Sequence, residues 1–270
     1  MGSSKRAKYG MRTIALVYVA ILVLVPIFVV TWRALSPGMS AFVDAVTSQE
    51  AITAFRLTLE IAIAAVVINV VYGVGAALLI SRYRFPGRRL LGSFTDLSVA
   101  VSPIVVGLAL ILVYGPYNGF FGKPLYENGF SIIFSLPGMI MAPAFVSMPL
   151  VMRSVLPVLD EEGIEQEQAA KVLGATAFQR FRRITLPTIK PALAYGIVLS
   201  LARCIGEFGA VKVVSGNISG SGQTLTTTLL IGQKSEQLEP GTYQLAFVLI
   251  LITVAAIAFV SFRRGKERAQ

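Results

Sequence analysis

Two residues of opposite charge, Arg203 and Glu207, stand four positions apart inside an apolar run of the sequence. Side chains at this spacing lie on one face of a helix and can form an ion pair. A charge at the centre of a membrane helix costs roughly 2.5–3.5 kcal/mol, so pairing makes it easier to keep there. The pair therefore predicts either a polar lining or gate of a translocation pathway, or a fixed contact between helices. The nearby Gly206 and Gly209 would allow a close helix contact or a break in the helix.

The remaining residue types exclude most enzymatic chemistry. There is no histidine, and the single cysteine, Cys204, lies in an apolar run where an inert buried thiol is expected. An aspartyl protease needs two facing membrane aspartates, and only Asp96 comes near an apolar run. No phosphate-binding G-x-x-x-x-G-K-[ST] motif occurs, because Gly122-Lys123 is followed by Pro124. We predict no catalysis and no bound metal or cofactor, and expect any ATP that drives this chain to be hydrolysed by a separate protein.

The composition is that of an integral membrane protein. Hydrophobic residues make up 55% and charged residues 14% of the chain, whereas soluble proteins carry about 25% charged residues. A spanning helix needs about 20 mostly apolar residues. We predict an all-α fold with about six transmembrane helices, over residues 14–32, 57–80, 97–114, 130–152, 188–214 and 243–262. Three prolines in the fourth run predict a kinked or broken helix, and Asp96 is expected to begin the third helix, where a carboxylate complements the helix dipole.

A long polar segment, residues 160–187, separates the fourth and fifth apolar runs. Residues 164–178 have helix-forming composition, with acidic residues early and basic residues late, as the helix dipole prefers. Gly174 could end or bend this helix. Its apolar side chains would suit the groove of a partner protein. An amphipathic helix on the lipid surface is the alternative, which the early carboxylates disfavour near an anionic membrane leaflet.

The distribution of basic residues predicts the orientation in the membrane. Most of the 24 lysines and arginines fall before the first run, between the second and third runs, in the polar segment and after the sixth run. Basic residues concentrate on the cytoplasmic side, so the polar segment and both termini are expected there, in the cell membrane. We predict a cytoplasmic tail at 1–12, a six-helix transmembrane domain at 13–262 and a second cytoplasmic tail at 263–270. The longest outer loop is expected at 215–242.

The polar segment resembles the EAA loop of ABC importer permeases. The matching spacing, A-A-x-x-x-G-x9-I-x-L-P, is carried by Ala169, Ala170, Gly174, Ile184, Leu186 and Pro187. The resemblance implies a type I importer (MetI-like) permease fold, in which a cytoplasmic coupling helix docks on the ATPase. It implies an ATPase-coupling role for Glu167, Gln168, Ala169, Ala170, Leu173, Gly174, Phe178 and Pro187. One position departs from the family pattern: the expected glutamate before the two alanines is Gln168, so we expect no ion pair with the ATPase there.

Three further stretches, residues 100–115, 134–159 and 202–220, resemble sulfate and molybdate permeases, and the whole pattern over 95–225 is nearest to W-type permeases of sulfate/thiosulfate importers. This resemblance implies a permease subunit that forms half of a translocation pathway. The implied partners are a homologous T-type permease subunit, two ATP-binding subunits that hold ATP-Mg, an extracytoplasmic sulfate-binding protein and membrane lipid, with no nucleic acid. A permease of a molybdate/tungstate importer, as a homodimer, is the alternative.

Overall fold

The computed structural model describes residues 5–215, 226–237 and 239–267, and every regular element in these ranges is helical. The prediction of an all-helical protein is therefore confirmed. The elements are α1 (Lys5–Leu35), α2 (Met39–Thr47), α3 (Gln49–Arg82), α4 (Arg88–Ala100), α5 (Pro103–Tyr114), α6 (Gly122–Glu127), α7 (Leu136–Glu162), α8 (Glu165–Val172), α9 (Ala177–Arg180), the π-helix η1 (Phe181–Thr185), α10 (Leu186–Ile205), α11 (Gly209–Val214), α12 (Thr227–Glu236) and α13 (Thr242–Glu267).

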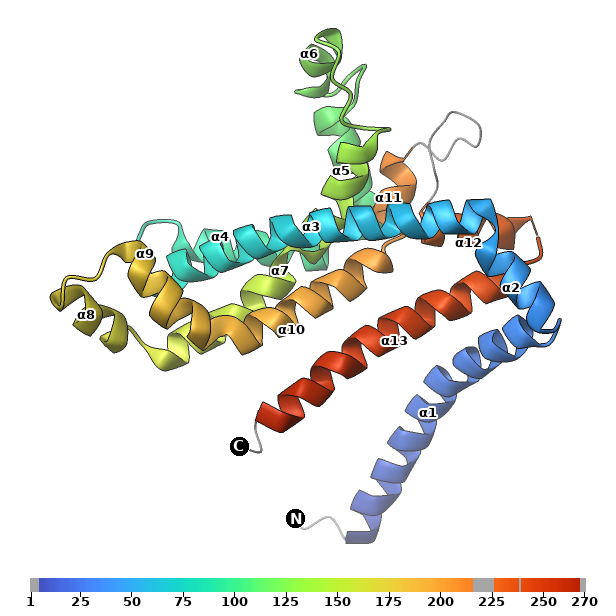
Figure 1. Cartoon of the computed structure of the whole chain (residues 1–270), viewed down its shortest axis with the longest axis horizontal. Helices are drawn as coiled ribbons and strands as arrows, with labels where there is room; N and C mark the ends of the chain where they lie inside the picture. The colour runs from blue at the N-terminus through green and yellow to red at the C-terminus, as the bar shows by residue number, and fades with distance from the viewer. Residues whose placement is uncertain (1–4, 216–225, 238, 268–270) are drawn as a thin grey trace.

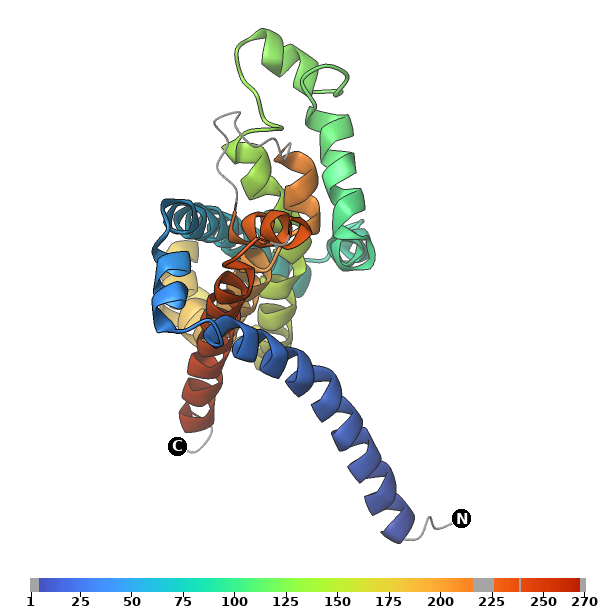
Figure 2. The same cartoon turned by 90° about the vertical axis from the view of Figure 1, so that its right-hand side faces the viewer.

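Three long helices, α3, α7 and α10, form the centre of the molecule and pack side by side (Figure 1, Figure 2). Two glycines bring their backbones close together. A Cβ atom at Gly73 would lie 2.7 Å from Val151 Cβ, and one at Gly196 would lie 3.0 Å from Val151 Cα. Small residues allow such close approach in membranes, where van der Waals packing holds helices together. The three helices therefore form one tightly packed unit.

The third apolar run does not form the single helix that was predicted over 97–114. It is divided between α4 and α5, which meet at an angle of 115°. Ser102 has an extended ψ of 137° and precedes Pro103, which begins α5. Proline disfavours helical geometry in the residue before it, and this explains the break. The prediction for Asp96 is also wrong, because Asp96 lies in the second half of α4 and its carboxylate accepts hydrogen bonds from Arg153.

The fourth apolar run forms α7, a continuous helix of 27 residues despite three internal prolines, Pro143, Pro149 and Pro157. The prediction was of a kinked or broken helix, and the run is not broken. More than half of its most apolar window, 56%, is buried inside the molecule. Contacts with the neighbouring helices α3 and α10 stabilise the helix where proline removes backbone hydrogen bonds.

The fifth apolar run, predicted as one helix over 188–214, is interrupted. α10 ends at Ile205, and α11 begins again at Gly209. The interruption falls at Gly206 and Gly209, the two glycines that were expected to allow a break or a close helix contact. Beyond it, α12 covers part of the predicted outer loop, while residues 216–225 and 238 of that loop lie outside the described residues.

Four helical segments of the described chain are long and apolar enough to cross a membrane, and the bent pair α4–α5 makes a possible fifth. The sixth predicted run lies in α13, whose described apolar stretch, Thr242–Ala255, is shorter. Figure 1 shows α1 and α13 approaching one another near α2 and diverging towards their free ends. Helix α1 begins at Lys5 and α13 continues to Glu267, so the described parts of the two predicted tails are helical.

Candidate coupling site and the break between α10 and α11

The polar segment at 160–187 folds as two short helices, α8 and α9, joined by a tight turn at one end of the central helices (Figure 1). Gly174 in this turn has a φ of +85°, a left-handed conformation that glycine adopts without steric cost. Thr176 then caps α9. Its Oγ1 accepts a hydrogen bond from the Gln179 backbone N–H at 3.3 Å, and Gln179 Oε1 accepts one from the Thr176 N–H at 2.8 Å. The prediction that Gly174 would end or bend the helix is confirmed.

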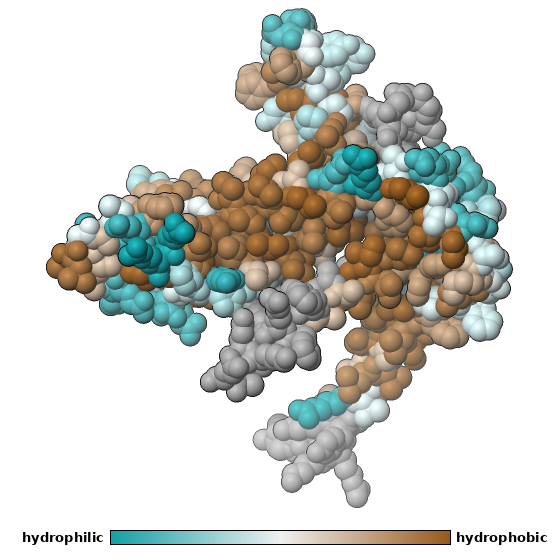
Figure 3. Space-filling model, viewed as in Figure 1, coloured by the Kyte–Doolittle hydropathy of each residue, from teal (hydrophilic) through white to brown (hydrophobic). Residues whose placement is uncertain are grey.

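The tip of this helix–turn–helix carries exposed apolar side chains. Val172 and Leu173 are each 87% exposed, and Phe178 is 68% exposed. Figure 3 shows hydrophobic atoms at this end of the molecule, bordered by hydrophilic ones. An apolar group surrounded by polar residues is typical of a protein interaction surface. Val172, Leu173 and Phe178 are called the apolar tip below.

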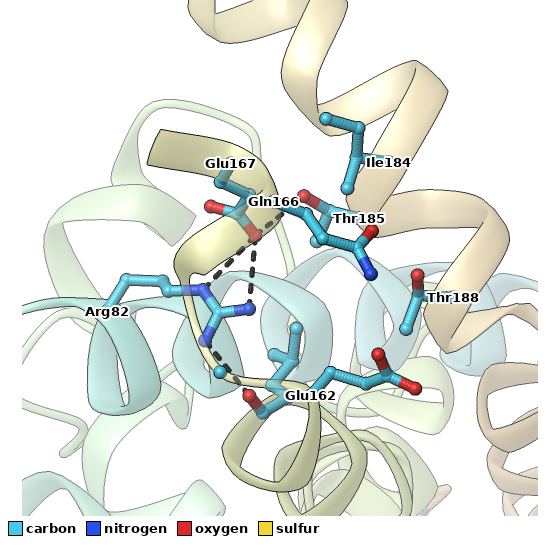
Figure 4. A pocket seen from close by; sticks show the side chains of 9 residues that line it. Arg82, Glu162, Gln166, Glu167, Ile184, Thr185 and Thr188 are labelled. Atoms are coloured by element: carbon cyan, nitrogen blue, oxygen red, sulfur yellow. Dashed lines mark hydrogen bonds and ion pairs between the residues drawn. The ribbon is translucent and has the colours of Figure 1, made fainter. Parts of the chain in front are cut away.

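Glu167 does not contribute to the apolar tip but contacts the central helices (Figure 4). Its Oε1 accepts hydrogen bonds from Arg82 Nη2 at 3.0 Å, Arg82 Nε at 3.2 Å and Thr185 Oγ1 at 3.0 Å. The Arg82 Nη1 atom also donates to the Leu159 carbonyl at 2.9 Å. The side chains of Arg82 and Glu167 are only 11% and 18% exposed. These contacts, called the Arg82–Glu167 bracket, join α8 to the ends of α3 and α7 and to η1.

The other residues predicted to couple lie around the bracket. Gln168 and Ala169 are exposed on α8, Ala170 is half-buried, and Pro187 is exposed in the first turn of α10. Gln168 also lines an open hollow of about 310 Å³ bordered by α3, α8 and α9, to which Arg180 contributes. The predicted residues thus gather at one end of the molecule, and the apolar tip is the part of this end that projects outward.

The predicted ion pair between Arg203 and Glu207 is present at the break between α10 and α11. Arg203 Nη1 lies 2.8 Å from Glu207 Oε2, and the two side chains are 41% and 2% exposed. The contact is ionic rather than a well-aligned hydrogen bond, since Oε2 has no partner that meets hydrogen-bond geometry. Its other oxygen, Oε1, accepts a hydrogen bond from the Ala210 N–H at 3.1 Å in the first turn of α11.

The backbone at the break is held from a third side. Thr228 Oγ1 donates to the Glu207 carbonyl at 3.0 Å, so Glu207 joins α10, α11 and α12. Gly206 caps the C-terminus of α10, and Gly209 begins α11, where a Cβ atom would lie 3.2 Å from Ile104 Cγ1 on α5. The two predicted glycines therefore serve different purposes: one ends a helix, and the other permits a close contact.

A buried polar cluster that the sequence did not reveal lies between α3, α7 and α10. Asn69 Nδ2 donates to Ser147 Oγ at 2.7 Å and to Ser200 Oγ at 3.1 Å. Ser147 Oγ lies 3.1 Å from Cys204 Sγ, and the cysteine is buried and free, as predicted. In the sequence, Asn69 is a single polar residue within the apolar run 57–80, and nothing near it in the chain indicates its partners. Hydrogen bonds of this kind hold membrane helices together.

At the opposite end of the molecule, a hollow of about 680 Å³ lies between α2 and the start of α13, with mixed charges on its walls. Lys234 Nζ lies 2.9 Å from Glu239 Oε2 and 3.3 Å from Glu50 Oε2. Its hydrogen bond to Glu239 is the main cause that raises the pKa of Lys234, and Glu50 adds to the effect. Among the described residues, no cluster of three or more His, Cys, Asp or Glu side chains could hold a metal ion.

The site and the fold are those of a transporter component. The chain belongs to the family of binding-protein-dependent transport system inner membrane components, whose family model matches residues 69–264. It is 42% identical to the sulfate transport system permease protein CysW of Synechococcus elongatus, over 94% of this chain and 89% of that protein. It is 40% identical to CysW of Escherichia coli K12, over 97% and 90% of the two chains.

A second group of sulfate permeases is also similar. The chain is 36% identical to the sulfate transport system permease protein CysT of Salmonella typhimurium, over 94% of this chain and 92% of that protein. Among solved structures, a bacterial alginate ABC transporter in complex with an alginate-bound periplasmic protein superposes with a TM-score of 0.73 at 18% identity, covering 94% and 92% of the chains. The MetNI methionine ABC transporter gives a TM-score of 0.56 at 17% identity, covering 81% and 94%. The fold is therefore that of type I ABC importer permeases.

Proposed function

We propose that this chain is the W-type permease subunit of an ATP-driven sulfate importer. The observation that carries the proposal is the identity of 40–42% to sulfate permeases named CysW, which extends over at least 94% of the chain. The chain is a transport subunit and not an enzyme, so ATP is hydrolysed by a separate subunit. Thiosulfate, another tetrahedral divalent anion, would share the pathway.

The partners are proposed from the same relationships. Similarity to both CysW and CysT supports pairing with a homologous T-type permease subunit, each forming half of the pathway. The family is defined by dependence on a binding protein, and the alginate transporter was solved with its periplasmic protein, so an extracytoplasmic sulfate-binding protein is the proposed donor. Two ATP-binding subunits, which hold ATP-Mg, complete the proposed complex.

In the proposed mechanism, the apolar tip and the residues around it dock in a cleft of the cytoplasmic ATPase. Motion of the ATPase reaches α3 and α7 through the Arg82–Glu167 bracket, and reaches α10 through η1. Helix α10 ends at the break, where the Arg203–Glu207 pair joins it to α11. We propose that this pair lines or gates the pathway, because the half-exposed guanidinium of Arg203 can meet an anion while Glu207 partly neutralises it.

The orientation belongs to the proposal as well. The apolar tip and the 82–89 turn lie at the same end, joined by the bracket, and basic residues concentrate on the cytoplasmic side. Both termini and the coupling segment are therefore proposed to be cytoplasmic.

An impermeant thiol reagent tests this orientation. It should label a cysteine placed at Leu173 only after the membrane is opened, whereas a cysteine placed at Tyr117 should react in intact cells.

The test of function is sulfate uptake by cells that lack their own W-type permease subunit. Expression of this chain with its three kinds of partner should restore uptake. In the reconstituted complex, binding protein loaded with sulfate should stimulate ATP hydrolysis, and molybdate-loaded binding protein should not. If only the molybdate-loaded binding protein stimulated ATP hydrolysis, the complex would be a molybdate importer instead.

A further inference from the structure

The turn between α3 and α4 carries three arginines that no described residue neutralises. Arg84, Arg88 and Arg89 form no ion pair, and residues 83–95 contain no acidic side chain. The nearest carboxylate that follows, Asp96, is paired with Arg153 at 2.6 Å. This part of the protein therefore presents three positive charges, and no described side chain supplies a counter-charge.

The three arginines surround a hollow rather than a flat surface. An open depression of about 340 Å³ is lined by Arg84, Phe85, Gly87, Arg88, Arg89 and Leu90. Gly87, with a φ of +96°, turns the chain sharply into α4, so that arginines before and after the turn border the same space. A guanidinium offers several N–H donors in a planar fork that matches phosphate oxygens. The hollow thus suits a phosphate group with room around it.

An apolar stripe begins at the edge of this hollow. Leu90, Phe94 and Leu97 are 74%, 53% and 49% exposed and recur at helical spacing along α4. Two polar side chains of α4 lie on the opposite, inner face: Thr95 and Ser98 are buried, and Thr95 Oγ1 lies 2.8 Å from Tyr72 Oη on α3. A row of exposed apolar side chains along a helix is suited to contact with lipid rather than with water.

From this arrangement we infer that the hollow formed by Arg84, Arg88 and Arg89 binds the phosphate headgroup of an acidic phospholipid, with its acyl chain along the stripe of Leu90, Phe94 and Leu97. Positive charge at one end and apolar surface along the rest match a single lipid molecule. The inference rests on the proposed function in one respect, the membrane leaflet to which the lipid belongs. The Arg82–Glu167 bracket places this turn beside the coupling segment, which is proposed to be cytoplasmic. The lipid would belong to the cytoplasmic leaflet, where anionic lipids attract basic residues.

The experiment uses the complete complex, assembled with its permease partner and ATPase subunits and purified from membranes that contain phosphatidylglycerol. Bound lipid is counted by native mass spectrometry. The double variant Arg84→Gln/Arg89→Gln should retain phosphatidylglycerol about tenfold less strongly, because each basic residue near an anionic surface contributes substantially to binding. The variant Phe94→Gln tests the apolar stripe without changing charge, and should weaken retention as well.

A matched control variant also removes two positive charges, but outside the hollow. Arg12→Gln/Lys123→Gln replaces two exposed basic residues outside the hollow and should leave phosphatidylglycerol retention unchanged. Equal retention by the arginine variant, or equal loss in the control, would overturn the inference. Loss of the ATPase subunits with lipid retention intact would also overturn it, because the arginines would then contact the ATPase. Lipid retention is measured without sulfate, so failure of the sulfate assignment would leave this result unaffected.

Discussion

Arg82 and Glu167 are the two residues on which the position of the coupling segment depends most directly. Replacing Arg82 by Gln leaves a mostly buried carboxylate with only Thr185 to bind it. We expect a loss of roughly 2–4 kcal/mol in the stability of the coupling segment, because a partly buried charge loses its partner. Anion-stimulated ATP hydrolysis should fall accordingly, while insertion into the membrane is retained.

The control for this prediction is a double variant. Arg82→Gln/Glu167→Gln removes both charges and should recover part of the lost thermal stability, as measured by denaturation of the purified complex. Arg182→Gln removes an exposed arginine of the same segment and should have little effect on stability. If Arg82→Gln behaved like Arg182→Gln, the bracket would not be what positions α8.

Asn69 is the centre of the buried polar cluster in the central helices. Asn69→Leu keeps the number and branching of the side-chain heavy atoms but removes the hydrogen bonds to Ser147 and Ser200. Hydrogen bonds between membrane helices contribute about 1–2 kcal/mol at most, and each serine would lose a partner. We expect a decrease of about 1–2 kcal/mol in unfolding free energy in detergent. Ser200→Ala, which removes only one of these bonds, should cost less, and an unchanged Asn69→Leu protein would contradict the role of the cluster.

At the scale of elements, the turn between α8 and α9 depends on a conformation that most residues avoid. Gly174→Leu has free space around its Cβ, but a φ of +85° is strained for leucine. The turn should rearrange and displace the apolar tip, so ATPase subunits should no longer copurify with a permease that still inserts. Gly174→Asn is the matched control, because asparagine tolerates left-handed geometry. Copurification and transport by Gly174→Leu would refute the docking mechanism.

Two glycines of α3, Gly73 and Gly75, differ in whether they contact α7. Gly73→Ala places a Cβ 2.7 Å from Val151 Cβ and 2.9 Å from the Met152 backbone nitrogen, so the helices must separate. We expect a cost of about 1–3 kcal/mol from overpacking. Gly75→Ala, two residues away, meets nothing within 4 Å and should be neutral or slightly stabilising. Thermal denaturation of the two variants distinguishes the outcomes, and equal stability would contradict the close packing.

The sequence predicted local features well and distant contacts poorly. Apolar runs, the Gly174 turn and the Arg203–Glu207 pair each depend on residues close in sequence, where spacing alone determines the contact. The break at Pro103 was also encoded locally, but the length of the apolar run concealed it. The Arg82–Glu167 bracket joins residues 85 positions apart, and the cluster at Asn69 spans three helices, so no periodicity could reveal them.

At the scale of the whole molecule, α1 stands apart from the central helices. None of the most apolar window of Met11–Leu35 is buried, and the helix packs mainly against α13 and α2. Its remaining apolar surface is exposed. Near the C-terminal end of α1, Arg33 Nη1 donates to Tyr243 Oη at 2.7 Å, which joins α1 to the start of α13.

The Arg82–Glu167 bracket has a consequence for how the protein is made. A ribosome completes Arg82 long before Glu167, and the two can meet only after α7 has been inserted and has returned to the side of the membrane where α3 ends. Thr185 and η1 are made later still. The nascent chain therefore cannot form the bracket during the early part of its synthesis, so the docking surface proposed above would be complete only after the central helices are in place.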